Sequence, residues 1–517
     1  MKGAIAASHP KTVEAGISML EQGGNAVDAA VAASFASFVA EPVLTSIGGS
    51  GIALVSNGQG KAASYDFFST MPSGEVTPMA DFRRITVDFG ATTQDFYIGR
   101  ASVAVPGAVA GLCLLAEQEG TLPLPTLLAP AIRMAHEGSL LTPFTAHTLR
   151  LLEPIFTNTP EIAAVFAPGG KLLTAGARVR IAGFADLLTA IAEQGAAAFY
   201  QGPAAEAFIA DQQAHHGLVR AEDLATYQAK ITEPLRVPYR QFEVLLPGYP
   251  SNGGVWAALA FKLMERLTFR EDEFLSPRHL QVLADVMRTL ENARTDLPEE
   301  KSAPAQSSAP FPNAEYLARY AATLPLSPSA SPGRGVGNTT HISVIDAAGT
   351  TVSITTTAGE AAGYIVPGTG VIPNNMLGEI DLHPNGFHRL PPGHRLTTMM
   401  TPAILLHRGR PVLAVGSGGS SRIRAAVFQV LSHVVDFKRP LASAVTAPRV
   451  YYQNGLLQVE GGMSPESLAH LSNVGYRLNV WQERSMYFGG ANAVAFHDGI
   501  FEAAGDPRRG GETALQE

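Results

Sequence analysis

The sequence predicts an α+β protein built from layers of helices and sheets, and three observations support this class. Hydrophobic residues make up 46% of the 517 residues, which is ample material for a large core. Helical periodicity prevails before about residue 300, whereas β-rich runs prevail after it. The strand runs are joined by hairpin signals, and this pattern favours α+β over a doubly wound parallel sheet.

Charge and cysteine content exclude several classes. The 37 basic and 45 acidic residues give a net charge of −8, and no basic block stands out. We therefore expect no nucleic-acid partner and no membrane partner. The single cysteine, Cys113, excludes an intramolecular disulfide framework. It lies in an apolar run, which predicts a buried structural thiol rather than a nucleophile.

The first residues do not resemble a signal peptide, because the apolar stretch is short and folded-looking sequence begins at once. The longest apolar run, 29–40, falls well short of the roughly 20 residues that span a bilayer. The sequence as written therefore predicts a soluble, cytoplasmic protein, and a trimmed leader would place it in the periplasm instead.

The N-terminal elements follow from periodicity and capping signals. Residues 11–20 have apolar positions at helical spacing, and two glycines end that pattern. Asn25 is then expected to cap a second helix, with Asp28 three positions on. This second helix is apolar almost all round, which predicts deep burial. The glycine turn at 46–51 leads into a strand and lacks the pattern and helix of a dinucleotide site.

The middle of the chain is mostly helical up to residue 227. Residues 239–267 are expected to form a strand, a glycine turn and a helix capped by Asn252, and another helix is expected near 278–293. The segments 302–312 and 325–338 are rich in Pro, Ser, Ala and Gly, with a short helical pattern around 315–322 between them. Such composition predicts a mobile linker.

Strands are expected after the linker. Residues 341–345 and 352–356 flank the turn 346–349, which predicts a hairpin. Further strands are expected at 403–407 and 411–415, and a glycine loop then opens a helix that runs to about residue 437.

The junction of linker and hairpin carries a candidate nucleophile, Thr339. A threonine hydroxyl needs a base, and one solution uses the residue's own α-amine, which exists only after chain cleavage before it. An α-amine has a pKa of roughly 7.7–8.0, so it accepts a proton near neutral pH. The alternative is that Thr339 and Thr340 simply have high β propensity.

The loop "GSGGSSR", 416–422, is a second candidate, because successive backbone N–H groups at a helix start form an anion or oxyanion site. A tight strand-to-helix turn explains it equally well. Arg422 and Arg424 either steer an anionic substrate or cover the helix edge. His383, His388 and His394 share one segment but have no metal-ligand spacing, so no metal is expected.

At this point many motifs, in one order, resemble the gamma-glutamyltransferase family of N-terminal-nucleophile hydrolases. They run over nearly the whole chain: "GGNAVDAAVA" (23–32), "GGSGIALV" (48–55), "VPGAVAGL" (105–112), "PSNGG" (250–254), "TTHISVID" (339–346), "NNML" (374–377), "TTMMTP" (397–402), "GSGGSSRI" (416–423) and "GDPRR" (505–509).

The resemblance implies a four-layer αββα sandwich, one domain made of two chains. Self-cleavage between Asn338 and Thr339 would give a large chain, 1–338, and a small catalytic chain, 339–517. Thr339 would be the nucleophile and its α-amine the base, while Thr357 would hydrogen-bond the nucleophile. The backbone N–H groups of Gly419 and Ser420 would form the oxyanion site, and no cofactor is implied.

The substrate end follows the family less closely. The family's carboxylate-binding arginine aligns at or near Thr77, and Arg83 and Arg84 just downstream are candidate substitutes. Glu379 stands where the family has an aspartate and is expected to bind an ammonium group. Thr398 keeps one hydroxyl of the family's serine pair.

Three further positions lose the family's side chains: Gly359 replaces an asparagine, Met376 a glutamine, and Met399 the second serine of that pair.

The resemblance therefore implies a self-processing threonine amidohydrolase that cleaves or transfers γ-glutamyl groups. The donor would be glutathione-like, and the acceptor water or an amine. The partners would be these small molecules and the protein's own two fragments in a heterodimer, with a higher oligomer left open. One alternative is a related acylase that acts on a different amide, such as a glutaryl amine. The other is a non-catalytic scaffold that retains the fold.

Overall fold

Two antiparallel sheets stack face to face in the middle of a computed structural model, which describes residues 2–88, 93–295, 338–383 and 386–516. The first sheet has seven strands in the order β20 (Glu512–Gln516), β1 (Gly3–Ala7), β11 (Thr340–Asp346), β12 (Thr351–Thr357), β2 (Ser50–Ser56), β3 (Ala62–Phe67) and β8 (Lys230–Thr232). The second has six, in the order β19 (Ile500–Ala504), β18 (Gly490–His497), β14 (Arg410–Gly418), β13 (Ala403–His407), β10 (Phe242–Leu246) and β9 (Leu235–Tyr239).

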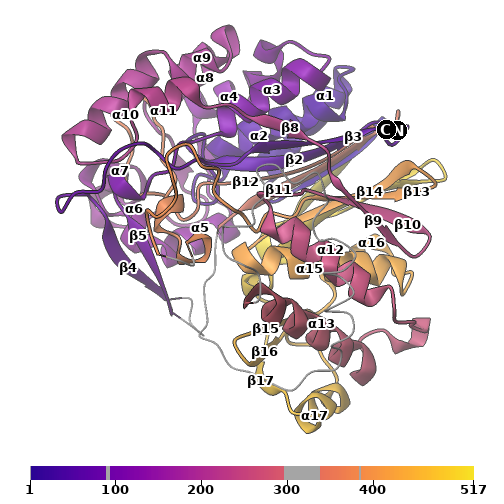
Figure 1. Cartoon of the computed structure of the whole chain (residues 1–517). Helices are drawn as coiled ribbons and strands as arrows, with labels where there is room; N and C mark the ends of the chain where they lie inside the picture. Colours follow the sequence, from indigo (N-terminus) through magenta and orange to yellow (C-terminus); the bar gives the residue numbers. More distant parts are fainter. Residues whose placement is uncertain (1, 89–92, 296–337, 384–385, 517) are drawn as a thin grey trace.

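Helices cover the outer face of each sheet, so the molecule has four layers, αββα (Figure 1). The helices α1 (Pro10–Glu21), α2 (Ala26–Ala40) and α3 (Ala108–Glu119) pack on the first sheet. The helices α12 (Asn252–Met264) and α15 (Ile423–Val435) pack on the second, with α13 (Pro277–Thr295) against α12. The predicted α+β class and its four-layer form are confirmed.

Small residues allow the two sheets to lie close together. Their shared core contains Ala4, Ala6, Leu54, Ala414 and Val494, among others, and all five are fully buried. Alternating strand residues therefore face either this inner core or a helical layer. β11 pairs with both β1 and β12, so the strand that follows Thr339 lies inside the sheet rather than at its edge.

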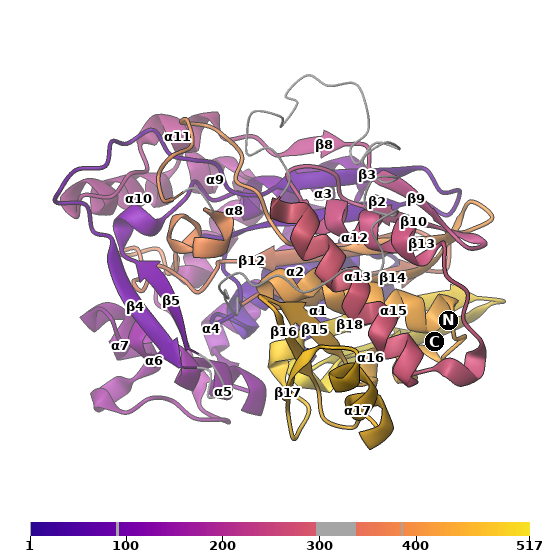
Figure 2. The ribbon, with the colours of Figure 1, turned by 60° about the horizontal axis from the view of Figure 1, so that its bottom comes forward.

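Smaller elements surround this sandwich (Figures 1 and 2). A hairpin of β4 (Arg83–Asp88) and β5 (Thr93–Ile98) projects from it in Figure 2. Among the described residues, the remaining helices of more than three residues are α4 (Leu124–Glu137), α5 (Pro143–Leu151), α6 (Glu153–Phe156), α7 (Pro160–Phe166), α8 (Phe184–Gln194), α9 (Ala197–Tyr200), α10 (Pro203–Ala214), α11 (Ala221–Thr226), α16 (Leu441–Thr446) and α17 (Pro465–Asn473). The remaining strands are β6 (Ser139–Leu140), β7 (Arg178–Val179), β15 (Val450–Gln453), β16 (Leu456–Val459) and β17 (Arg477–Val480).

The local signals gave most element ends correctly. Asn25 caps α2 in a complete capping box with Asp28, and every residue of α2 is buried as its apolar sequence predicts. One prediction was wrong: Ser251 caps α12, because its hydroxyl accepts from the Gly254 N–H at 2.9 Å, and Asn252 is the first helical residue. The predicted linker segments, except Asn338, and the short helix near 315–322 lie outside the described residues.

Candidate active site

The predicted cleavage point lies at the start of β11, inside the sandwich. The chain is continuous from Asn338 to Thr339, and both residues are almost fully buried. Thr340 begins β11 and pairs with Thr356 of β12, so the two strands fix the backbone immediately after the predicted nucleophile. Sheet pairing thus fixes the chain from the residue immediately after Thr339 onward.

Thr357, the last residue of β12, contacts the predicted scissile bond directly. Its hydroxyl donates a hydrogen bond to the carbonyl oxygen of Asn338. The Gly359 N–H donates to the same hydroxyl at 2.9 Å. Because the hydroxyl oxygen accepts from Gly359, its single proton is directed at the carbonyl. A donor on this oxygen polarises the carbonyl that Thr339 would attack.

The glycine loop lies against the backbone of Thr339. A Cβ atom on Gly418 would lie 2.2 Å from the Thr339 carbonyl oxygen, so only glycine allows this approach. The next two residues, Gly419 and Ser420, have positive φ angles of 123° and 51°. The Ser420 hydroxyl donates to the Asp381 carboxylate at 3.2 Å. The structure therefore brings Thr339, Thr357 and this loop together.

A buried carboxyl group, missed by sequence reasoning, anchors the second threonine. Glu41, which follows α2, accepts hydrogen bonds from the hydroxyls of Thr340 at 2.8 Å and Thr12 at 2.6 Å. Burial raises the pKa of Glu41 to about 7, and the two hydroxyls oppose that rise. Thr340 is therefore tied to the helical layer, which gives the Thr-Thr pair two different roles.

A second missed carboxyl group contacts Asn338. The Asn338 N–H donates to Oε1 of Glu360 at 2.9 Å, and Glu360 is 1% exposed. Burial raises the pKa of Glu360 to about 8; the Asn338 N–H and the charges of Arg509 and Arg422 oppose the rise. The Glu360 N–H donates to the side-chain oxygen of Asn375 at 2.7 Å, which fixes this residue's backbone. No local sequence pattern marks Glu360, because its partner is 22 residues away.

Two buried arginines lie behind the glycine loop. Cβ atoms on Gly418 and Gly419 would each lie 3.3 Å from a terminal nitrogen of Arg509. The Nε and Nη1 atoms of Arg509 and the Nη2 atom of Arg422 have no hydrogen-bond partner within the described part of the chain. Burial lowers the pKa of Arg509 to about 10, with the charge of Arg422 adding to the effect. The two guanidinium groups therefore place positive charge near the loop, and this charge favours the ionised form of Glu360.

The position of the family's asparagine is occupied differently here. A Cβ atom on Gly359 would lie 2.3 Å from Oε1 of Glu379 and 2.3 Å from Oδ1 of Asn375. The carboxyl of Glu379 thus fills the space beside Gly359. Burial, followed by the charges of Glu360 and Asp381, raises the pKa of Glu379 well above its usual range.

The other predicted substrate residues have contacts of their own. Thr398 is buried, and its hydroxyl accepts from the Met400 N–H at 3.2 Å. Arg83 and Arg84 stand on β4, with side chains 53% and 62% exposed. Arg83 pairs with Asp81 at 3.1 Å, and Arg84 pairs with Asp95 at 2.8 Å. Neither of these ion pairs involves Glu379 or Thr398.

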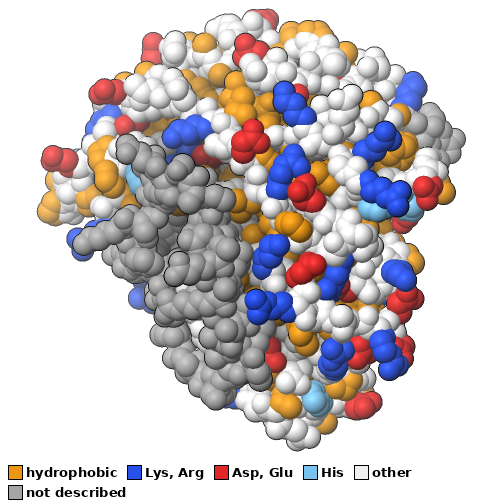
Figure 3. Space-filling model, turned by 45° about the vertical axis from the view of Figure 1, so that its right-hand side comes forward, with side chains coloured by type: hydrophobic (Ala, Val, Ile, Leu, Met, Phe, Trp, Pro, Cys, Tyr) orange, Lys and Arg blue, Asp and Glu red, His pale blue; other side chains and the backbone are white. Residues whose placement is uncertain are grey.

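The described residues contain no cluster of His, Cys, Asp or Glu side chains that could hold a metal ion. His383 and His388 instead contact the backbone carbonyls of Met376 and Ala101, at 3.0 and 2.9 Å. On the face shown in Figure 3, the described Lys and Arg side chains are interspersed with Asp and Glu.

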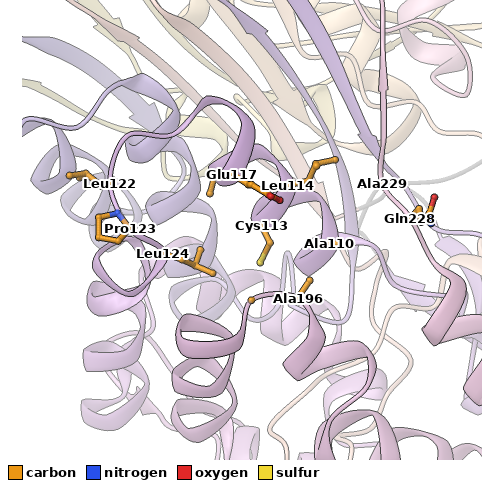
Figure 4. Close-up of a pocket in the computed structure, with 12 residues that line it drawn as sticks. Ala110, Cys113, Leu114, Glu117, Leu122, Pro123, Leu124, Ala196, Gln228 and Ala229 are labelled. Atoms are coloured by element: carbon orange, nitrogen blue, oxygen red, sulfur yellow. The ribbon is translucent and has the colours of Figure 1, made fainter.

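A surface groove lies on the helical layer, and none of these groups lines it. This groove of about 640 Å³ is lined by α3, the start of α4 and the turn before α9 (Figure 4). Cys113 lines it, and burial raises the pKa of the Cys113 thiol to about 12, so the thiol stays protonated near neutral pH. None of the predicted site residues lines this groove.

Comparison with known proteins gives one consistent result. A family model described as Gamma-glutamyltranspeptidase matches residues 12–516. The acylase ACY 1 proenzyme of Pseudomonas sp. (strain SE83) is 33% identical, over 97% of this chain and 91% of that protein. The glutathione hydrolase proenzyme of Escherichia coli (strain K12) is 28% identical, over 98% and 90%.

A crystal structure of cephalosporin acylase from Bacillus halodurans superposes with a TM-score of 0.81 at 26% identity. The match covers all of this chain and 96% of that one. Within the described residues, no helix combines the length and the apolar character needed to cross a bilayer.

Proposed function

Because the chain belongs to the gamma-glutamyltranspeptidase family, we propose that it is a self-processing threonine amidohydrolase that works as an acylase. Members of this family are hydrolases and transferases, among them relatives named as glutathione hydrolases and acylases. The observation that carries the proposal is the hydrogen bond from the Thr357 hydroxyl to the Asn338 carbonyl in the unbroken chain.

The first step is cleavage of the chain. The Thr339 hydroxyl oxygen attacks the Asn338 carbonyl carbon, the C–N bond breaks, and the proton of the hydroxyl ends on the new α-amine. The resulting ester between Asn338 and Thr339 is then hydrolysed by water, which leaves Asn338 with a carboxylate and Thr339 with a free amine. Thr357 stabilises the negative charge that develops on the carbonyl oxygen. The products are two fragments, 1–338 and 339–517, which stay together as a heterodimer.

The second step uses the same nucleophile on a substrate amide. The Thr339 α-amine takes the proton of the hydroxyl, Thr339 attacks, and the leaving amine receives that proton. The backbone N–H groups of Gly419 and Ser420 are the proposed donors to the oxyanion. Water or an acceptor amine then releases the acyl group from Thr339. No metal or redox group enters either step as we propose it.

Acylase action is favoured over γ-glutamyl transfer by the acyl end of the site. The carboxyl of Glu379 fills the space at Gly359, and Arg83 and Arg84 are paired with neighbouring carboxylates. Of the two relatives aligned above, the acylase is also more similar in sequence than the glutathione hydrolase. Transfer or hydrolysis of γ-glutamyl groups from glutathione-like donors remains the second candidate, because Glu379 can still bind an ammonium group.

A denaturing gel and two substrates test this proposal. We expect the wild-type chain to give two bands, with Thr-Thr-His at the start of the smaller fragment. Thr339→Ala should give one inactive band near 54.4 kDa. Thr340→Ala is the matched control: its hydroxyl contacts Glu41 rather than the scissile bond, so this variant should still cleave.

The cleaved enzyme should then release p-nitroaniline faster from glutaryl-p-nitroanilide than from γ-glutamyl-p-nitroanilide. The reverse order would establish the second candidate. A single uncleaved band from the wild-type chain would contradict an enzymatic function and favour a scaffold.

A further inference from the structure

Asn338 serves as an internal model of the acyl group that the enzyme accepts. In the unbroken chain, Asn338 is the acyl half of the bond that Thr339 is proposed to attack. The acyl half of a substrate amide must later be joined to the same Thr339 oxygen. Since both reactions pass through an ester at one atom, they share the space around the carbonyl carbon. The contacts of Asn338 therefore describe the acyl pocket from within.

Both hydrogen-bond donors of Asn338 meet acceptors. The backbone N–H, which is bonded to the carbon next to the scissile carbonyl, donates to Oε1 of Glu360 at 2.9 Å. The side-chain amide donates to the Val43 carbonyl oxygen at 3.4 Å. The carbonyl oxygen itself accepts from Thr357. The carboxyl of Glu360 thus accepts from an N–H that is borne on the carbon next to the scissile carbonyl.

Cleavage leaves Glu360 short of partners. Its Oε2 atom already has no hydrogen-bond partner within the described residues, and Oε1 loses the Asn338 N–H when the new chain end departs. With Asn338 in place, Glu360 is 1% exposed. A buried carboxyl group without its donor is costly, and an incoming N–H that restores the hydrogen bond recovers that cost.

We infer, on the basis of the acylase function proposed above, that Glu360 selects acyl groups that carry an N–H on the carbon bonded to the scissile carbonyl. The substrate class is thus α-aminoacyl amides and N-acyl-α-aminoacyl amides, and the products are an α-amino acid, free or N-acylated, and an amine. A γ-glutamyl group carries its nitrogen two carbons further from the carbonyl. It does not place an N–H where Asn338 has one.

Three p-nitroanilides with nearly the same acyl skeleton test this on the cleaved wild-type enzyme. They are L-asparaginyl-p-nitroanilide, its N-acetyl derivative, and 3-carbamoylpropionyl-p-nitroanilide, which lacks only the α-nitrogen of the first. We expect kcat/KM to be about tenfold or more higher for at least one N–H-bearing substrate than for 3-carbamoylpropionyl-p-nitroanilide. Preference for the free amine identifies an ammonium ligand, and preference for the acetylated form identifies an amide N–H.

The outcomes separate the two proposals. Equal or faster turnover of 3-carbamoylpropionyl-p-nitroanilide overturns the role of Glu360 but leaves the acylase function intact. A chain that has split in two yet hydrolyses none of these anilides, nor glutaryl-p-nitroanilide, overturns the acylase function and this inference with it.

A substitution at Glu360 then tests whether its side chain causes the preference for N–H-bearing acyl groups. At a pH above the raised Glu360 pKa of about 8, Glu360→Gln should lower the selectivity for the N–H-bearing substrate by roughly 5–10-fold, because a neutral amide oxygen then replaces a carboxylate. Glu41→Gln is the matched control, since Glu41 is also buried but contacts Thr12 and Thr340. It should leave the selectivity ratio unchanged. Full selectivity in Glu360→Gln would overturn the assignment, and if that variant fails to cleave, the wild-type substrate series still decides.

Discussion

The two ends of the candidate site are built in different ways. The end that holds the proposed scissile bond consists of backbone and short hydroxyls at strand ends: Thr339 before β11, Thr357 at the end of β12, and Gly418 at the end of β14. The proposed acyl end consists of longer side chains from irregular segments, chiefly Glu360 and Glu379. Sheet pairing fixes the first end, whereas side-chain changes alone can rebuild the second.

If the proposed roles hold, this difference accounts for a family that includes relatives named as acylases and as glutathione hydrolases. Reaction chemistry needs a nucleophile and donors in fixed geometry, which the stacked sheets supply. Substrate choice needs only different side chains around the acyl group. One such change is seen here: the carboxyl of Glu379 occupies the space that a side chain at position 359 would fill.

The largest expected effect concerns the hydroxyl at the reaction end. Thr357→Val keeps the shape of the side chain but removes the donor to the Asn338 carbonyl. Loss of one oxyanion donor typically costs about 10²–10³-fold in rate, so cleavage of the purified precursor should slow by that amount. The measurement is a time course of fragment appearance on denaturing gels.

Thr357→Ser is the control, because it keeps the hydroxyl and should cleave within a few-fold of the wild-type rate. Cleavage of Thr357→Val at the wild-type rate would mean that the hydrogen bond to Asn338 has no part in processing. The strand-built end would then lose its proposed donor.

A smaller effect is expected at the boundary between the two ends. In Gly359→Ala, the new methyl group would lie 2.3 Å from oxygens of both Glu379 and Asn375. Such overpacking typically lowers the free energy of unfolding by about 1–3 kcal/mol, and urea unfolding of the cleaved enzyme measures it.

Gly169→Ala is a close control for the backbone. Gly169 and Gly359 share a φ of 65°, but a Cβ on Gly169 would meet nothing within 4 Å. Both variants carry the cost of a non-glycine residue at positive φ, so their difference isolates the crowding. Equal destabilisation of the two would show that Glu379 moves away from Gly359 without cost.

The sequence predicted the features that depend on neighbouring residues and missed those that depend on distant ones. The hairpin of β11 and β12 and the capping box at Asn25 depend on neighbouring residues, so local patterns were sufficient. The contact of Glu41 with Thr340 joins residues 299 positions apart, and nothing near either residue signals it. Glu360 was missed for a related reason: a glutamate after a strand is ordinarily exposed, and this one is buried against residues distant in the sequence, Asn338 and Asn375.

The smallest effect is expected for the two arginines that the sequence offered as carboxylate ligands. Arg83 and Arg84 are more than half exposed and are paired with Asp81 and Asp95. To hold a donor carboxylate, each arginine would first have to leave its present partner. An exposed ion pair contributes only about 0–1 kcal/mol, so replacing one such pair by another changes the binding free energy little. We therefore expect the double variant Arg83→Ala, Arg84→Ala to change kcat/KM for glutaryl-p-nitroanilide by no more than about twofold.

A complementary experiment removes the ion-pair partner of Arg84 instead of the arginine itself. Asp95→Asn removes the charge that pairs with Arg84, so a guanidinium able to reach the donor should then lower KM for carboxylate-bearing acyl groups only. An unchanged KM in Asp95→Asn, together with a near-neutral double arginine variant, would leave recognition to the buried carboxyl groups at the acyl end. A tenfold rise of KM in the double variant would instead restore the arginines as the carboxylate clamp, and the acyl end would then resemble the γ-glutamyl enzymes more than its buried contacts indicate.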